Sequence, residues 1–159
     1  MKCRWPIAFM RLGPLLLMLG GCAFDAPPAN PPSPSLGTFR DAVYPVLLRD
    51  CGFPACHGDT ERFFRVYGPG RTRLDGLATG APLDDEEIRA SYDRARSMLS
   101  SAGRAEDTLL LRKPLEVDVG GAPHMGIDQH GRDIYQTTAD DGYTTIRRWV
   151  LPVFPEAAP

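Results

Sequence analysis

The sequence predicts an all-α domain with long irregular loops, preceded by a signal peptide and a proline-rich tether. Apolar residues recur at helical spacing in four stretches, and no stretch alternates as a half-buried strand would. Sixteen glycines and sixteen prolines make up about a fifth of the 159 residues, which indicates many turns and little regular structure. With 18 basic and 20 acidic side chains, the charge is too balanced for a nucleic-acid-binding protein, so no nucleic-acid partner is expected.

The first 21 residues are interpreted as a signal peptide. A basic start is followed by an almost continuous apolar run over residues 12–19, which is too short to cross a bilayer. The run ends in Leu19-Gly20-Gly21-Cys22, which resembles the processing box of bacterial lipoproteins. The resemblance implies cleavage before Cys22, a lipid on its thiol and a membrane-anchored protein of the cell envelope that faces the periplasm or the exterior. An ordinary signal peptide with an incidental cysteine is the alternative.

Two further regions follow the signal peptide. Residues 22–36 contain the lipidated cysteine and five prolines with almost nothing to bury, so they are expected to form a semi-stiff extended tether. No internal repeat is present in the remainder. The folded part is therefore predicted to be one domain over residues 37–155.

The first two helices of this domain are expected over residues 39–50 and 84–99. Thr38 is placed to cap the first helix, and Pro45 is expected to kink it. Asp84 and Glu87 have the spacing of a capping box at the start of the second helix, where acidic side chains also favour the helix dipole.

Two shorter helices are expected later, over residues 105–111 and 141–150, with Asp140 placed to cap the last one. Long irregular stretches remain at 58–83 and 112–139. Helices alone bury too little apolar surface to order loops of this length. A large apolar cofactor is therefore expected to organise them.

The sharpest motif is Cys51-Gly52-Phe53-Pro54-Ala55-Cys56-His57-Gly58, which follows the first helix. Two thiols followed at once by a histidine is the arrangement that holds c-type haem, because the thiols add to the vinyl groups and the imidazole ligates the iron. The chain here resembles the c-type cytochrome family. It departs from the family in having four residues rather than two between the cysteines, and Pro54 indicates a turned loop.

The later half of the chain is also similar to small bacterial cytochrome domains that read L-L-x-K-P, then a glycine-rich H-G-G-G, then tyrosine and a Trp-Ile pair. The corresponding residues here are Leu110-Leu111-Arg112-Lys113-Pro114, Gly120 to Gly126, Tyr143 and Trp149-Val150. The resemblance covers most of residues 39–151. It implies a small cytochrome c-like domain with covalent haem c that carries single electrons, so an electron carrier is favoured over an enzyme.

The sixth iron position has two candidates in this resemblance, His124 and Met125, which lie next to each other in a glycine-flanked loop. The H-G-G-G similarity favours His124, so His57 and His124 are the expected metal ligands and Met125 is the alternative. A sixth position that is open or filled by another group is a third interpretation. His124 is expected to point toward His57, with Met125 turned away. His57 is expected to face a cavity lined by Phe39, Val43 and Tyr143. His130 lies in a polar turn and is expected to be solvated.

Four arginines follow the cysteine motif together with three aromatic residues: Arg62, Arg65, Arg71, Arg73, Phe63, Phe64 and Tyr67. In a haem protein, such arginines pair with the propionates and such aromatic rings line the porphyrin edge. A solvated basic loop is the alternative interpretation for any one of them.

Other interpretations of the cysteine motif remain open at this point. An exported protein usually oxidises paired thiols, so a haem-free lipoprotein with a Cys51–Cys56 disulfide, acting as a binding or structural module, is the main alternative. A zinc site formed by Cys51, Cys56, His57 and His124 is a further one. A third is an enzyme subunit whose haem supplies electrons to another protein. No redox partner can be inferred from the sequence. The sequence also contains no Ser-His-Asp order, no phosphate-binding loop and no H-E-x-x-H motif.

Overall fold

The computed structural model describes residues 30–74, 77–100, 102–125 and 133–154. Their elements are α1 (Leu36–Thr38), η1 (Phe39–Val43), α2 (Tyr44–Asp50), α3 (Asp85–Ser97), η2 (Ala105–Asp107), α4 (Leu109–Arg112), η3 (Val117–Val119), α5 (Asp141–Val150) and η4 (Leu151–Val153). The single β-bridge within these ranges joins Leu115 to Tyr135, so the all-α expectation is confirmed. The expected signal peptide, Cys22, the first part of the tether and His130 lie outside the described residues.

The first helix starts earlier than predicted and takes an unusual form. Elements α1, η1 and α2 follow one another without a break, and Ser35 rather than Thr38 caps the start, with its hydroxyl accepting from the Thr38 N–H at 3.1 Å. Pro45 has no N–H to donate, and the backbone just before it widens into the π-helical turn η1. The run of helical residues thus continues through Pro45, and its departure from regular α-helical geometry is a π turn just before this proline.

The remaining helices correct two further expectations. The capping box of Asp84 and Glu87 is present at the start of α3, as predicted. The helix expected over 105–111 is instead split into η2 and α4 by Thr108, whose backbone is extended and whose hydroxyl donates to the Ala105 carbonyl at 2.7 Å. Asp140 precedes α5 without capping it, because its carboxylate accepts hydrogen bonds from the preceding turn.

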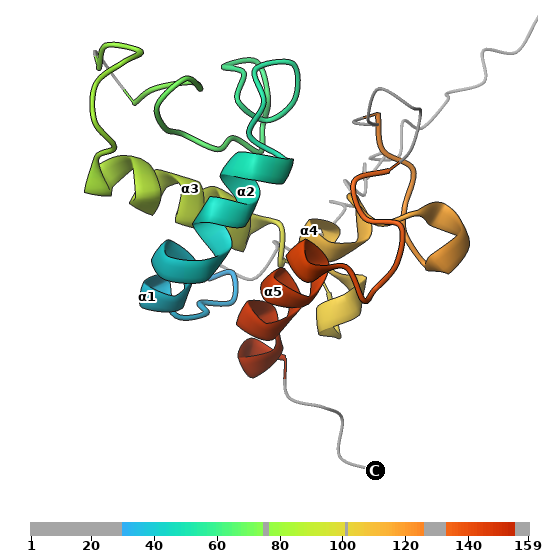
Figure 1. Cartoon of the computed structure of the whole chain (residues 1–159). Helices are drawn as coiled ribbons and strands as arrows, with labels where there is room; N and C mark the ends of the chain where they lie inside the picture. Colours follow the sequence, from blue (N-terminus) through green and yellow to red (C-terminus); the bar gives the residue numbers. More distant parts are fainter. Residues whose placement is uncertain (1–29, 75–76, 101, 126–132, 155–159) are drawn as a thin grey trace, which may run out of the picture.

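The core lies where η1, α2, α3 and α5 meet (Figure 1). Three buried rings occupy its centre: Phe39 lies 5.4 Å from Tyr92 and 5.2 Å from Trp149, centroid to centroid. Aromatic pairs at such separations are favourable beyond the area that they bury. Within the described ranges, every helix is too short or too polar to cross a membrane.

The end of the expected tether, residues 31–35, is bound to the domain. The Tyr92 hydroxyl donates to the Pro34 carbonyl at 2.7 Å, and the Trp149 indole N–H donates to the next carbonyl along at 2.8 Å. Arg96 donates to two more carbonyls of the same segment. An extended proline-rich segment leaves its carbonyls free to accept such bonds. The folded domain therefore begins several residues before the predicted boundary.

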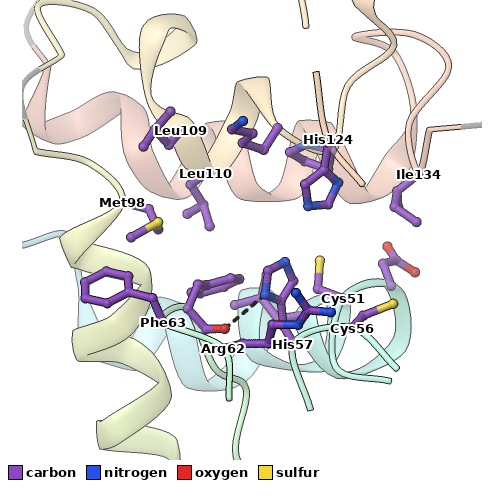
Figure 2. Close-up of a pocket in the computed structure, with 15 residues that line it drawn as sticks. Cys51, Cys56, His57, Arg62, Phe63, Met98, Leu109, Leu110, His124 and Ile134 are labelled. Carbon is purple, nitrogen blue, oxygen red and sulfur yellow. Dashed lines mark hydrogen bonds between the residues drawn. The ribbon is translucent and has the colours of Figure 1, made fainter. Parts of the chain in front are cut away.

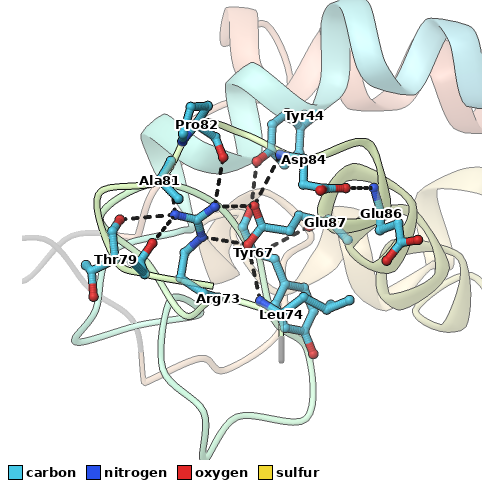
Figure 3. A network of polar contacts seen from close by, with 12 residues as sticks. Tyr44, Tyr67, Arg73, Leu74, Thr79, Ala81, Pro82, Asp84, Glu86 and Glu87 are labelled. Carbon is cyan, nitrogen blue, oxygen red and sulfur yellow. Dashed lines mark hydrogen bonds and ion pairs between the residues drawn. The ribbon is translucent and has the colours of Figure 1, made fainter. Parts of the chain in front are cut away.

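The irregular stretch over residues 58–83 is organised by a buried ion pair (Figure 3). The side chains of Arg73 and Glu87 are 5% and 0% exposed, and two hydrogen bonds of 2.7 and 2.8 Å join them. Burial alone would raise the pKa of Glu87, but hydrogen bonds from Arg73 and from the backbone of Leu74 and Asp84 hold it below its ordinary value. The Arg73 guanidinium also donates to four loop carbonyls, those of Ala78, Thr79, Ala81 and Pro82. Contacts within the protein thus hold the part of this stretch around Arg73.

Candidate functional site

A cavity of about 270 Å³ lies beside the C-terminal end of α2. Figure 2 shows it as a slot with Leu109, Leu110, His124 and Ile134 on one side and Cys51, Cys56, His57 and Arg62 on the other. The remaining lining residues are Leu47, Asp50, Phe63, Phe64, Met98, Lys113 and Pro114. Most of these groups are apolar, and the slot brings together residues from the two ends of the domain.

The cysteine motif forms a compact loop at the end of α2. The backbone N–H of His57 donates to the carbonyl of Cys51 at 3.0 Å. This bond closes the segment into a turn, as Pro54 indicated. A side chain at Gly58 would collide with the carbonyl oxygen of Gly52, so only glycine permits this close return of the backbone. The longer spacing between the cysteines is therefore absorbed by a loop that folds back on itself.

Both thiols of this loop line the cavity, and neither is bonded to the other. Burial raises the pKa of Cys51 to about 12, helped by the nearby Asp50 carboxylate and Cys56. Cys51 is therefore a neutral thiol at ordinary pH, and neutral thiols are poor metal ligands and slow in disulfide exchange. In the part of the chain that the structure describes, no three His, Cys, Asp or Glu side chains are grouped to hold a metal ion, so the zinc arrangement is not formed.

His57 is held with one ring nitrogen available to the cavity. Its Nδ1 lies 2.9 Å from the Phe64 carbonyl oxygen, and because a carbonyl only accepts, Nδ1 carries the proton. Burial lowers the pKa of His57, and charge at His124 and Arg62 lowers it further, although the bond to Phe64 acts the other way. The neutral ring thus keeps its lone pair on Nε2, which points into the slot (Figure 2). A backbone carbonyl holding the other nitrogen is typical of a metal-ligating histidine.

His124 faces His57 from the opposite side of the slot (Figure 2). The two ring centroids are 5.8 Å apart and the ring planes differ by 14°. Metal–nitrogen bonds of about 2 Å, with ring centres about 1 Å behind each nitrogen, require centres roughly 6 Å apart for one metal ligated by both rings. The distance between the two imidazoles therefore matches the distance that one shared metal ion would require. Met125, the alternative ligand, is 97% exposed and does not line the slot.

The shape of the slot fits a flat apolar ligand. Its volume of about 270 Å³ lies just below the usual range for cofactor sites, about 300–1,000 Å³. Phe63 and Leu109 line it and are 67% and 46% exposed, so the slot is open to solvent on their side. A planar group larger than the enclosed volume can extend past them. The donor set, the apolar walls and the open edge together agree with haem.

The structure separates the seven residues that follow the motif. Arg62, Phe63 and Phe64 line the slot. The other three arginines do not: Arg73 is bound to Glu87, Arg71 lies over the Phe53 ring, and Arg65 donates to a backbone carbonyl. Tyr67 is buried, and its backbone is bonded to the hydroxyls of Tyr44 and Ser91. Only Arg62 among the four arginines remains a candidate to pair with a propionate.

One expectation about the cavity is wrong. Phe39, Val43 and Tyr143 do not line it, because all three are packed into the core. The slot lies one helical turn further along, where Leu47 from α2 and Ile134 form parts of its wall. Helical periodicity identified the buried face of the first helix correctly, but it could not tell core from cavity, since both select apolar residues.

Sequence reasoning also missed several lining residues: Leu47, Asp50, Met98, Leu109 and Ile134. The segment similar to L-L-x-K-P does contain three residues that line the slot, namely Leu110, Lys113 and Pro114. The carbonyl of Phe64, which orients His57, has no sequence signal because any residue supplies a carbonyl.

Comparisons with known proteins add no relative: no protein-family model, no curated protein and no solved structure matches the chain.

Proposed function

We propose that the chain is a membrane-anchored c-type cytochrome-like protein that carries single electrons at the cell envelope. Haem c would be attached through the thiols of Cys51 and Cys56, with His57 and His124 as axial ligands. The domain would then be a small cytochrome c-like fold. Cys22 would carry the lipid that holds it to a membrane, and a redox partner protein would exchange electrons with it.

One observation carries this proposal: two nearly parallel imidazoles face each other across an apolar slot whose rim holds two free thiols. Both rings are half-buried and lie beside two cysteines, an arrangement that a chance pair of surface histidines does not require. The orientation of His57 by the Phe64 carbonyl adds to it, because that bond leaves Nε2 available for a metal.

Bound haem would supply the one-electron iron couple, and the residues of the chain determine how it is held. Cys51 and Cys56 would hold the haem through thioether bonds, which form by addition of a thiol S–H across a vinyl group and so would need no oxidant. The Phe64 carbonyl holds His57 in the tautomer that ligates a metal. The apolar side chains of Leu47, Leu110 and Ile134 line the wall of the slot and would shield this part of a bound haem from water. A dry pocket with fixed ligands suits electron transfer because little reorganisation accompanies a change of charge.

The deciding experiment is expression of the full-length chain in cells that contain the haem-attachment machinery. We expect a purified protein with a haem spectrum that survives acid–acetone extraction, because thioether bonds persist after unfolding. Mass spectrometry should find one haem on the peptide that contains Cys51 and Cys56, and none in the Cys51→Ser, Cys56→Ser double variant. A peptide two hydrogens lighter than the dithiol, with no haem mass, would establish the disulfide alternative.

The lipid anchor has its own test. The Cys22→Ser variant should lack the acyl acceptor and should be found unprocessed or in the soluble fraction, whereas the unaltered chain should partition with membranes. Continued membrane association of the processed Cys22→Ser protein would overturn the anchor without affecting the proposed haem.

A further inference from the structure

Lys113 connects α4 to the segment that carries His124. It follows α4 directly, is half-buried and lines the slot. Its ammonium donates to the carbonyl of Pro123 at 2.7 Å, and Pro123 immediately precedes His124. A lysine whose stem follows apolar surface usually extends its ammonium into water. Here the ammonium lies at an exposed position and also donates to a backbone carbonyl next to a candidate ligand.

The contact is one of two adjacent anchors. The N–H of Ala122 donates to the Arg112 carbonyl at 2.8 Å, so residues 122 and 123 are bound to residues 112 and 113, respectively. Pro123 has no N–H of its own, so its carbonyl is the backbone group through which this position can be held. A charged donor makes a stronger bond to a carbonyl than a neutral one does.

We propose that Lys113 is a positioning residue for the distal ligand: its bond to the Pro123 carbonyl aims the His124 imidazole across the slot at His57. This role rests on the proposed function. Lys113 does not itself ligate the iron in this account, and it acts only through the backbone of the following segment.

The main variant is Lys113→Met, which keeps an apolar stem along the slot and removes the ammonium. Arg112→Met is the matched control, since it removes one positive charge from the neighbouring residue, whose side chain does not line the slot. Lys113→Arg restores a cationic donor of similar reach and should recover part of the effect.

The first readout does not require haem. In the haem-free full-length chain, hydrogen–deuterium exchange at the Ala122 amide should be about fivefold to tenfold faster in Lys113→Met, as loss of a neighbouring hydrogen bond predicts. Arg112→Met should exchange like the unaltered chain. Equal exchange in all three proteins would overturn the proposal.

The second readout is spectroscopic. In the haem-loaded protein, added imidazole should displace the distal ligand at roughly tenfold lower concentration in Lys113→Met than in the unaltered chain or in Arg112→Met. If the unaltered protein is low-spin and Lys113→Met gives the same imidazole titration, the role of Lys113 is overturned and the proposed function is not. An unaltered chain that attaches no haem would overturn the proposed function, and this role with it.

Discussion

The two long irregular stretches, residues 58–83 and 112–139, are held in different ways. The first is centred on a fully buried ion pair, in which Arg73 binds Glu87 and gathers four backbone carbonyls (Figure 3). The described part of the second is held at its edges, by the Leu115–Tyr135 bridge and the bond from Lys113 to Pro123. The first stretch is therefore held from within by a buried side chain that pairs with α3, while the described part of the second is held by contacts at its edges, near the end of α4.

This difference separates stability from ligand placement. Phe64, which orients His57, belongs to the same stretch of chain as Arg73. The side of the slot that carries His57 is therefore fixed by the fold itself. The side of the slot that carries His124 depends on a few contacts made by the backbone near this histidine. Changes around the ion pair should therefore affect unfolding, and changes in the distal segment should mainly affect the slot.

The largest expected effect comes from the ion pair. Glu87→Gln leaves the Arg73 guanidinium buried without a counter-charge and should reduce the free energy of unfolding by about 3 kcal/mol. Urea unfolding of the haem-free chain, followed by circular dichroism, measures it. Asp93→Asn, also on α3, removes a carboxylate from half-exposed ion pairs and should change stability little. Equal effects of the two variants would contradict the comparison.

A smaller loss of stability is expected from a change at Gly121, where the segment that leads to His124 turns. An added Cβ would collide with the Leu115 carbonyl oxygen, so Gly121→Ala should displace the turn and cost about 2 kcal/mol. Gly103→Ala is the control, because a Cβ there meets nothing within 4 Å. Thermal unfolding of both variants gives the comparison. If Gly121→Ala unfolds like the unaltered chain, the distal turn is not constrained as described.

The ion pair also predicts a dependence on pH. The pKa of Glu87 is lower in the folded chain than in the unfolded chain, so its stabilisation is present above the unfolded value and is lost as pH falls through the folded value. Stability should therefore decline below about pH 4, the ordinary range of a glutamate, and more steeply in the unaltered chain than in Glu87→Gln. Urea midpoints from pH 7 to pH 3 measure this. Parallel declines in the two proteins would exclude Glu87 as the cause.

The smallest effect on stability is expected at His124, the proposed distal ligand, where the effect on the haem spectrum should be greatest. His124→Ala should leave unfolding of the haem-free chain nearly unchanged and should convert a six-coordinate low-spin haem to high spin. Met125→Leu should change neither, because that side chain is exposed. The reverse result would identify Met125 as the ligand. An unchanged spin state in both variants would mean that the sixth position is open or is filled by another group.

Local sequence patterns anticipated much of this structure. The all-α class followed from helical periodicity and from the absence of alternation, and the capping box at Asp84 followed from spacing alone. The sequence alone identifies Cys51, Cys56, His57 and His124 as candidate haem-binding residues, and the structure brings all four side chains to one slot. These features are local, or they involve residue types that are rare in the chain.

Only the tertiary structure decided which residues those features meet. Arg73 and Arg62 have the same side chain in the same basic stretch, yet one is bound to Glu87 in the interior and the other lines the slot. Phe39 and Leu47 are both buried in the core cluster, yet Leu47 also lines the slot and Phe39 does not. Residue type and periodicity determine that a side chain will be buried or paired, whereas its partner depends on how distant segments pack, which no local pattern encodes.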